Sequence, residues 1–417
     1  MFVNGTFRLA AGSELVTTNC FAFIGTNGTG SMFVEGGTWE AQYIAVGNGG
    51  IGSLTFSGGT TRTRSYLSLG NTPGTAITNY GTGTVVLNGG ELITTNTGGI
   101  VVSTHIGGGG VSNDGGSGFM TVSNGIWRSS DVYVSNGKLT IAGGVTLLAS
   151  ANYGSLYVGA YSSNGNVLIT GGELTVTNPF TAIHLGLASS NYSSRGEMTI
   201  SNGLWRARSV YLVRRSSTDY PQAETGTGIL NIAGGLSVIS SNLVIGNDAC
   251  VGEATVTMTA GSLFVTNSTQ ESVLEIKSGT FNLRGGLLHA DKIVLRNCGR
   301  LIHTGGNLVA GSIDMQPNGD ADGDGLPNYW EQQNGFNVFD PTTGVEDIDD
   351  DGLDNFVEYW LGSDPRDAGD PMRITGVHVV SNDVHVTWKY VPPPGNSYKR
   401  YAVEATPSLT STWFTVS

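Results

Sequence analysis

Two short stretches carry aspartates at positions 1, 3 and 5 and a glutamate at position 12, DADGDGLPNYWE at 320–331 and DIDDDGLDNFVE at 347–358. Twelve-residue calcium loops place oxygen ligands at positions 1, 3, 5, 7, 9 and 12, with glycine at position 6 for the turn. Both stretches match at each position, so we predict two Ca²⁺ sites. The expected ligands of the first are Asp320, Asp322, Asp324, the carbonyl of Leu326, Asn328 through a water, and Glu331; those of the second are Asp347, Asp349, Asp351, the carbonyl of Leu353, Asn355 and Glu358.

The acidity of the chain is concentrated around these loops. The net charge is -13, and residues 318–370 hold 15 of the 33 acidic residues with one base, Arg366, which leaves 18 acids and 19 bases elsewhere. Acidic turns solvated without metal are the alternative, but carboxylates crowded in this way repel each other unless a cation neutralises them. The local charge therefore favours a cation, with Ca²⁺ preferred over the water-rich octahedral coordination of Mg²⁺, and excludes a basic nucleic-acid surface.

After each loop, PNYWEQQNG and NFVEYWLG are typical of short helices, which Trp330, Phe356, Tyr359 and Trp360 can pack together. The stretch 318–365 resembles the aspartate-rich repeats of the dockerin and thrombospondin type 3 families. That resemblance implies calcium binding and leaves two roles open. One is a calcium-stiffened linker between two domains, which fits the position of the loops in the chain, and the other is docking to a cohesin-type partner.

Most of the remaining chain follows a repeat of about 27 residues, G-x-h-x-h-x-G/N-G followed by a second apolar stretch and h-x-h-G, where h is apolar. Its first glycine falls at Gly5, Gly30, Gly52, Gly83, Gly118, Gly137, Gly165, Gly196, Gly228 and Gly252. The alternation of apolar and polar residues predicts short strands, each too short to bury one face without a neighbouring unit. Stacked units of this length predict an all-β parallel β-helix of about ten or eleven coils, because propeller blades need about 40 residues.

Units such as GSLTFSGGT, GKLTIAGGV, GNVLITGGELTV and GILNIAGG resemble the autotransporter-associated β-strand repeats of secreted bacterial passenger proteins. The resemblance covers roughly residues 5–315 and implies a secreted or surface-displayed bacterial β-helix. We therefore divide the chain into β-helix repeats at 1–316, paired calcium-binding loops with short helices at 317–370, and an incomplete sandwich at 371–417. The last segment alternates apolar and polar residues and resembles the start of a fibronectin type III or immunoglobulin-like domain.

Two aromatic columns emerge when the units are aligned. Trp39, Trp127 and Trp205 share a position that is Leu92 or Leu174 in other units, which predicts interior packing. The middle residue of h-x-h-G is expected to point outward, and five consecutive coils place a ring there: His105, Tyr133, Tyr157, His184 and Tyr211. This stripe of roughly 19 Å is either a stabilising ladder or a face that binds a glycan, a matrix or another cell-surface ligand.

The sequence predicts no catalytic site. Glu91 and Glu173 share a register but lie three coils apart, roughly 14 Å, whereas glycosidase carboxylates stand about 5 to 10 Å apart. The six histidines show no metal-ligand spacing, and no nucleophile motif occurs. A polysaccharide lyase or hydrolase assembled from distant loops stays the alternative.

Other features bear on where the protein works. No apolar run is long enough for a membrane span, and the N-terminus has no signal peptide but already follows the repeat, so we expect a chain truncated at both ends. Cys20, Cys250 and Cys298 are too few for a disulfide scaffold, and we expect buried free thiols. Together these observations predict a non-catalytic extracellular or cell-surface protein with a structural or adhesive role and a calcium-stiffened linker.

Overall fold

The computed structural model describes residues 1–70, 80–95, 103–108, 115–149, 154–160, 163–187, 194–213, 226–369, 374–380, 383–388, 403–405 and 414–416. It divides into two compact units, Met1–Asp322 and Gly323–Ser417. The boundary falls within the first acidic loop. The predicted divisions near residues 316 and 370 stay predictions.

The first unit is all β. Its strands are β1 (Phe2–Val3), β2 (Thr6–Leu9), β3 (Glu14–Ile24), β4 (Thr29–Val34), β5 (Thr38–Val46), β6 (Ile51–Phe56), β7 (Thr60–Leu69), β8 (Thr82–Leu87), β9 (Glu91–Thr94), β10 (Ser103–Ile106), β11 (Ser117–Val122), β12 (Ile126–Ser129), β13 (Asp131–Val134), β14 (Gly137–Ile141), β15 (Val145–Leu148), β16 (Leu156–Ala160), β17 (Asn164–Ile169), β18 (Glu173–Val176), β19 (Ile183–Leu187), β20 (Arg195–Ile200), β21 (Leu204–Leu212), β22 (Thr227–Ile245), β23 (Glu253–Val265) and β24 (Val273–Asp314).

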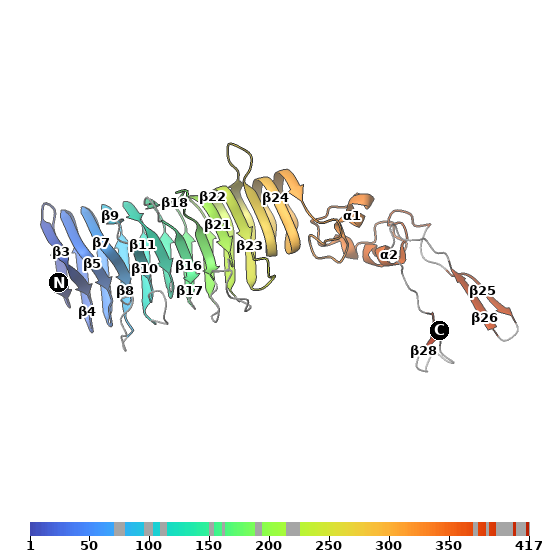
Figure 1. The fold of residues 1–417 in the computed structure, drawn as a ribbon, viewed down its shortest axis with the longest axis horizontal. Helices are drawn as coiled ribbons and strands as arrows, with labels where there is room; N and C mark the ends of the chain where they lie inside the picture. Colours follow the sequence, from blue (N-terminus) through green and yellow to red (C-terminus); the bar gives the residue numbers. More distant parts are fainter. Residues whose placement is uncertain are drawn as a thin grey trace. The chain divides into compact units, whose positions relative to one another are not determined.

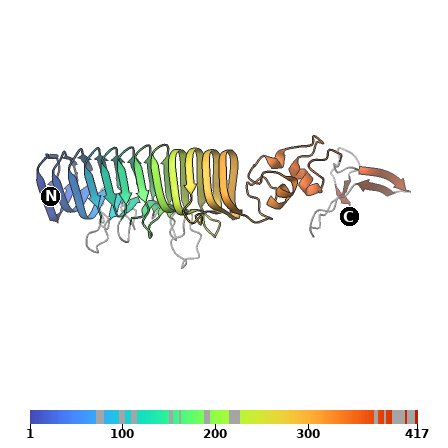
Figure 2. The same ribbon diagram turned by 90° about the horizontal axis from the view of Figure 1, so that it is seen from above.

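Each strand pairs in parallel with the equivalent strand of the next coil, so the chain winds as a parallel β-helix (Figure 1). One row of strands runs from β2 through β4, β6, β8, β11, β14, β17 and β20 to β22. A second row runs from β3 through β5, β7, β9, β12, β15 and β18 to β21. Viewed from above, the successive coils lie side by side along the unit (Figure 2).

The first glycines of the repeat stack in one column. Gly30, Gly52, Gly83, Gly118, Gly137, Gly165, Gly196 and Gly228 pair in register, one coil to the next. A Cβ at Gly83 would lie 2.1 Å from the carbonyl oxygen of Val46 on the preceding coil, so the column has no room for side chains. The predicted member Gly252 is wrong, because Gly228 pairs with Ala254.

The interior is continuous and mostly apolar, with buried threonine and serine side chains among the apolar ones. Trp39, Trp127 and Trp205 are fully buried and stack in register with Leu92 and Leu174, which confirms the prediction of interior packing. The indole N–H groups of Trp39 and Trp127 each donate to a threonine hydroxyl 3.4 Å away, Thr17 and Thr94 respectively. The position therefore accepts Trp or Leu because it lies in the core.

The prediction of three buried free thiols is wrong. Cys250 and Cys298 form a disulfide, and Cys20 is a free, exposed cysteine. The two bonded residues are separated by 48 positions in the sequence, and only the winding of the coils brings them together.

The second unit contains short helices α1 (Asn328–Asn334) and α2 (Asn355–Leu361) and the 3₁₀ helix η1 (Thr343–Val345). The helices expected after the two acidic loops are thus present. β25 (Ile374–Val380) pairs antiparallel with β26 (Asp383–Trp388), and β27 (Val403–Ala405) with β28 (Phe414–Val416). Most of the tail lies outside the described residues, and a fibronectin type III-like domain stays a prediction. No helix in the described part of the chain is long and apolar enough to cross a membrane.

Candidate functional site

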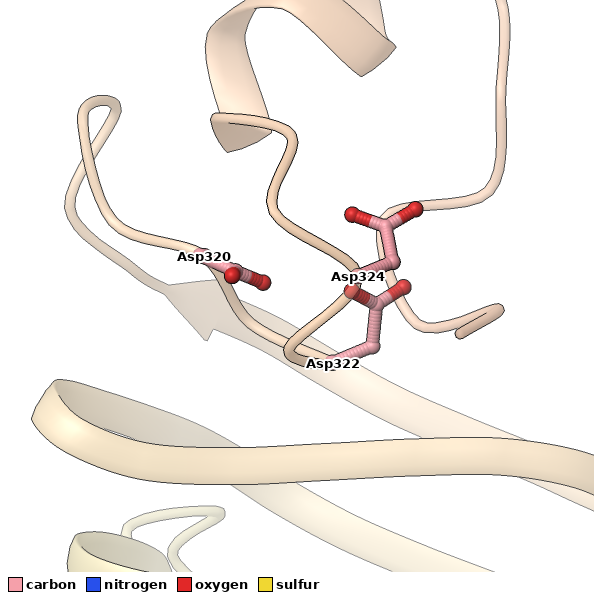
Figure 3. A group of neighbouring side chains, drawn as sticks. All are labelled: Asp320, Asp322 and Asp324. Carbon is pink, nitrogen blue, oxygen red and sulfur yellow. The ribbon is translucent and has the colours of Figure 1, made fainter. Parts of the chain in front are cut away.

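The first acidic loop brings its aspartates together. One carboxylate oxygen each from Asp320, Asp322 and Asp324 lies within 4.8 Å of the others. Figure 3 shows Asp320 pointing toward the other two side chains, which project from the same turn. The backbone N–H of Leu326 donates to Asp324 Oδ1 at 2.8 Å, and Gly325 takes φ 95°, the left-handed turn expected at position 6.

The second loop repeats this conformation. Oxygens of Asp347, Asp349 and Asp351 lie within 4.8 Å of one another. The N–H of Leu353 donates to Asp351 Oδ1 at 2.9 Å, and Gly352 takes φ 94°. Two sequences that differ at loop positions 2, 4, 8, 10 and 11 thus fold in the same way, because an aspartate at position 5 and a glycine at position 6 fix the same turn.

Helix geometry extends the repeat beyond the loops. α1 and α2 begin at the ninth loop position, Asn328 and Asn355, and both end at a left-handed glycine, with φ 72° at Gly335 and 77° at Gly362. The helices carry the residue at position 12 back toward its loop. Glu331 and Glu358 are accordingly buried, each with 0% exposure.

Glu358 is the most informative of the predicted ligands. Neither of its carboxylate oxygens has a hydrogen-bond partner although both are buried. Burial, with a smaller contribution from the nearby charges of Asp349, Asp351 and Asp347, raises the pKa of Glu358 to about 7. The neighbouring Ser363 hydroxyl lowers the pKa of Glu358 in part, although the two groups do not meet the geometry of a hydrogen bond. A buried carboxylate among acids is costly unless a cation compensates it.

Other atoms of the second loop are arranged in the same way. Asp349 Oδ2, Asp351 Oδ2 and Asn355 Oδ1 are buried oxygens without a hydrogen-bond partner. The amide nitrogen of Asn355 donates to the carbonyl of Thr343 at 2.8 Å, which leaves its oxygen as the available ligand atom. Burial is also the main cause that raises the pKa of Asp349. These hard oxygen donors fit Ca²⁺.

The predicted ring column is in register. The middle residues of successive h-x-h-G strands pair from coil to coil in the order Phe23, Ala45, Ser68, His105, Tyr133, Tyr157, His184, Tyr211 and Val244. From His105 to Tyr211 the rings stack face to face, with centroid separations of 4.9, 4.7, 5.0 and 5.5 Å and interplanar angles of 6 to 13°.

The stacking determines which parts of the rings are accessible from outside. Each inner ring has its neighbours on both faces, so the flat surfaces are occupied and only ring edges face outward. His105 and His184 are each 7% exposed, less than the outward position suggested. His105 Nε2 is hydrogen-bonded to the Ser103 hydroxyl at 2.8 Å, Nδ1 has no hydrogen-bond partner, and burial lowers its pKa to about 4.

Sequence reasoning missed the aromatic residues that extend the column toward the N-terminus. Tyr66 lies 6.0 Å from His105 and Tyr43 lies 6.0 Å from Tyr66, centroid to centroid. Phe2 and Phe21, which the sequence reasoning also missed, continue the cluster around Phe23, which it had placed in the column. Tyr43 and Tyr66 stand two residues before the column position on their strands, a spacing that directs side chains to the same face and could have identified them.

Glu91 and Glu173 do not form a catalytic pair. Their register runs from Glu91 through Ile126 and Val145 to Glu173, which confirms that three coil steps separate them. Each lies beside an arginine, with Glu91 2.7 Å from Arg128 and Glu173 3.9 Å from Arg206.

In comparisons with protein-family models, curated proteins and solved structures, nothing matches this chain.

Proposed function

We propose that this chain is a non-catalytic structural and adhesive protein of the cell exterior, in which two bound Ca²⁺ ions stiffen residues 317–370. The observation that carries the proposal is the second loop, where the buried carboxylate of Glu358 faces an aspartate triad and has no hydrogen-bond partner. The first loop supplies the other ion site, because it has a matching turn and its own aspartate triad. Weak sites of the extracellular class suit a millimolar Ca²⁺ environment.

The position of the loops favours a linker over docking. They lie between a β-helix and a predicted sandwich, where bound ions lock a segment that has little apolar core of its own. A dockerin-like docking role is the alternative, and high-affinity capture of a cohesin-type partner by the calcium-loaded chain would favour it.

Calorimetric titration of the full chain with Ca²⁺ tests the metal assignment. We expect two ions per chain and a melting transition of the second unit that falls on chelation, since Ca²⁺ at 100 times Kd stabilises by about 2.7 kcal/mol per site. Asp349→Asn and Asp351→Asn each remove a ligand from the second loop and should weaken Ca²⁺ binding there at least about tenfold.

Asp350→Asn is the matched control. Asp350 lies between these ligands, is exposed, and takes φ 61°, a conformation that asparagine also tolerates. It removes the same charge without removing a ligand, so binding should stay within about twofold of the unmodified chain. An equal loss of Ca²⁺ affinity in Asp350→Asn and Asp349→Asn would refute the site. So would the absence of any heat of binding on titration with Ca²⁺.

The disulfide supports a location outside the cell. Bonds such as Cys250–Cys298 persist in oxidising compartments and are rare where thiol reductants are abundant. A secreted or surface-displayed protein is consistent with this pairing.

For the adhesive role, we propose that the outer face of the β-helix contacts a glycan, matrix or cell-surface ligand along the ring column. The occupied ring faces favour contacts through tyrosine edges rather than sugar stacking. Incubation of the calcium-loaded chain with a polysaccharide panel tests this. Retention that is lost in Tyr133→Ala and Tyr157→Ala, but not in Phe119→Ala, an exposed ring outside the column, would support the proposal. Release of soluble fragments would show a polysaccharide-degrading activity instead.

A further inference from the structure

The disulfide lies on the surface of the β-helix and crosses one coil. Ile245 pairs with Ile276 on the next coil, and Gly299 of the following coil approaches the Ile276 backbone in turn. The bond between Cys250 and Cys298 therefore spans the coil between them. Both cysteine residues are exposed, which places the bond at the surface of the folded unit.

The turn that carries Cys250 has its own hydrogen bonds. Asn247 Oδ1 accepts from the N–H groups of Ala249 at 3.0 Å and Val251 at 3.4 Å, and its amide nitrogen donates to the Val251 carbonyl at 2.8 Å. The Asn247 N–H donates to the Ser278 hydroxyl at 3.0 Å, which ties the turn to the intervening coil. These bonds do not involve the sulfur atoms.

The next coil contains the same turn without cysteine. Asn267 Oδ1 accepts from the N–H groups of Thr269 at 3.0 Å and Glu271 at 3.2 Å. Gln270 takes φ 59°, and Cys250, at the equivalent place, takes φ 55°. The Asp291 carboxylate also accepts from the N–H groups of Asn267 and Ser272. The turn thus forms without a disulfide, and the covalent bond is an addition to it.

We propose that Cys250–Cys298 is a thiol-exchange site, at which the folded protein is covalently modified by a low-molecular-weight thiol. An incoming thiolate attacks one sulfur, forms a mixed disulfide with it and expels the other cysteine as a thiolate, which takes a proton from water. The step needs no oxidant, because one disulfide is exchanged for another. The β-helix keeps its coils, since the Asn247 network holds the turn.

Glutathione is the probe, and Cys20→Ser removes the other thiol from the calcium-loaded full chain. We expect one glutathionyl group per chain at Cys250 or Cys298, with the freed partner trapped by iodoacetamide and the strand signal in circular dichroism unchanged. The rate should rise about tenfold for a tenfold increase in glutathione, as direct attack on an accessible bond requires. A rate independent of glutathione, or loss of strand signal on opening, would overturn the proposal.

Two asparagine variants test why the fold survives. In Asn247→Ala, opening of the disulfide should release the turn, seen as faster hydrogen exchange at residues 248–251. In Asn267→Ala, the matched control, exchange at these residues should stay unchanged on opening. If the unmodified turn already exchanged freely after opening, the asparagine network would not hold it and the proposal would be wrong. Calcium binding is measured separately, so failure here leaves the proposed function untouched.

Discussion

Lowering the pH should destabilise the β-helix through His105, which lies within the ring column. His105 is 7% exposed, with Tyr66 on one side and Tyr133 on the other, and its hydrogen-bond partner among the described residues is Ser103. The pKa of His105 is lowered from 6.5 to about 4 because burial disfavours the charged ring. Asp131, opposite Ser103 in register, instead accepts from the N–H groups of Gly154 and Ser155.

The sign follows from which state binds the proton. Above pH 6.5 the ring is neutral in both states and the full stability is present. As the pH falls below 6.5, the unfolded chain binds a proton that the folded chain does not, so stability is lost progressively until the pH passes about 4. Between pH 7.5 and 4.5 this residue should remove about 2.5 kcal/mol from the free energy of unfolding.

Urea unfolding at the two pH values, followed by tryptophan fluorescence, measures this loss. His105→Phe keeps a stacking ring but cannot titrate, so its pH dependence should be smaller than that of the unmodified chain by about 2.5 kcal/mol. Its loss of the bond to Ser103 lowers stability equally at both pH values and cancels in the comparison. Tyr133→Phe changes a neighbouring ring and should keep the full dependence. Equal pH dependence in the unmodified chain and His105→Phe would refute the reasoning.

Two further predictions concern the coil interior, both measured by urea unfolding. Gly172→Ala should lower the free energy of unfolding by about 1–3 kcal/mol more than Gly12→Ala. Both positions need a left-handed backbone, but a Cβ at Gly172 would lie 2.5 Å from the backbone of Gly143, whereas nothing lies within 4 Å of a Cβ at Gly12. Equal losses would contradict a steric origin. Trp127→Ala should cost about 3–5 kcal/mol, and Trp127→Leu less, because leucine is found at this register position on the preceding coil, at Leu92; a larger loss with leucine would contradict core packing.

The sequence was sufficient for the coils and for their register up to Gly228. Glycine spacing identified the units, and alternation around Trp127 and Tyr133 separated inward from outward positions, because both signals are local to one strand. The error at Gly252 came from a turn of different length, where Ala254 takes the column position. Alignment by the nearest glycine cannot detect such a shift, since pairing between coils, not residue type, sets the register.

What could not be predicted depends on contacts between coils. Cys250 and Cys298 lie 48 residues apart, and their pairing requires the lengths of every turn between them. The close stacking of His105 on Tyr133 follows from ring orientation, which a column of residue types does not specify. For the two acidic loops the predicted ligand spacing was readable because it lies within twelve residues, whereas the burial of Glu358 depends on how α2 packs.

Charge and ring geometry together restrict how such a protein can adhere. Outside residues 318–370 acids and bases nearly balance, and the glutamates Glu91 and Glu173 lie beside arginines, so the β-helix has little net field to attract a charged polymer. The stacked faces of Tyr133 and Tyr157 are already in contact with each other. For the proposed adhesive role we therefore expect hydrogen bonds to an array of edges repeated at the coil spacing, which favours a polymer with its own regular repeat over a small ligand.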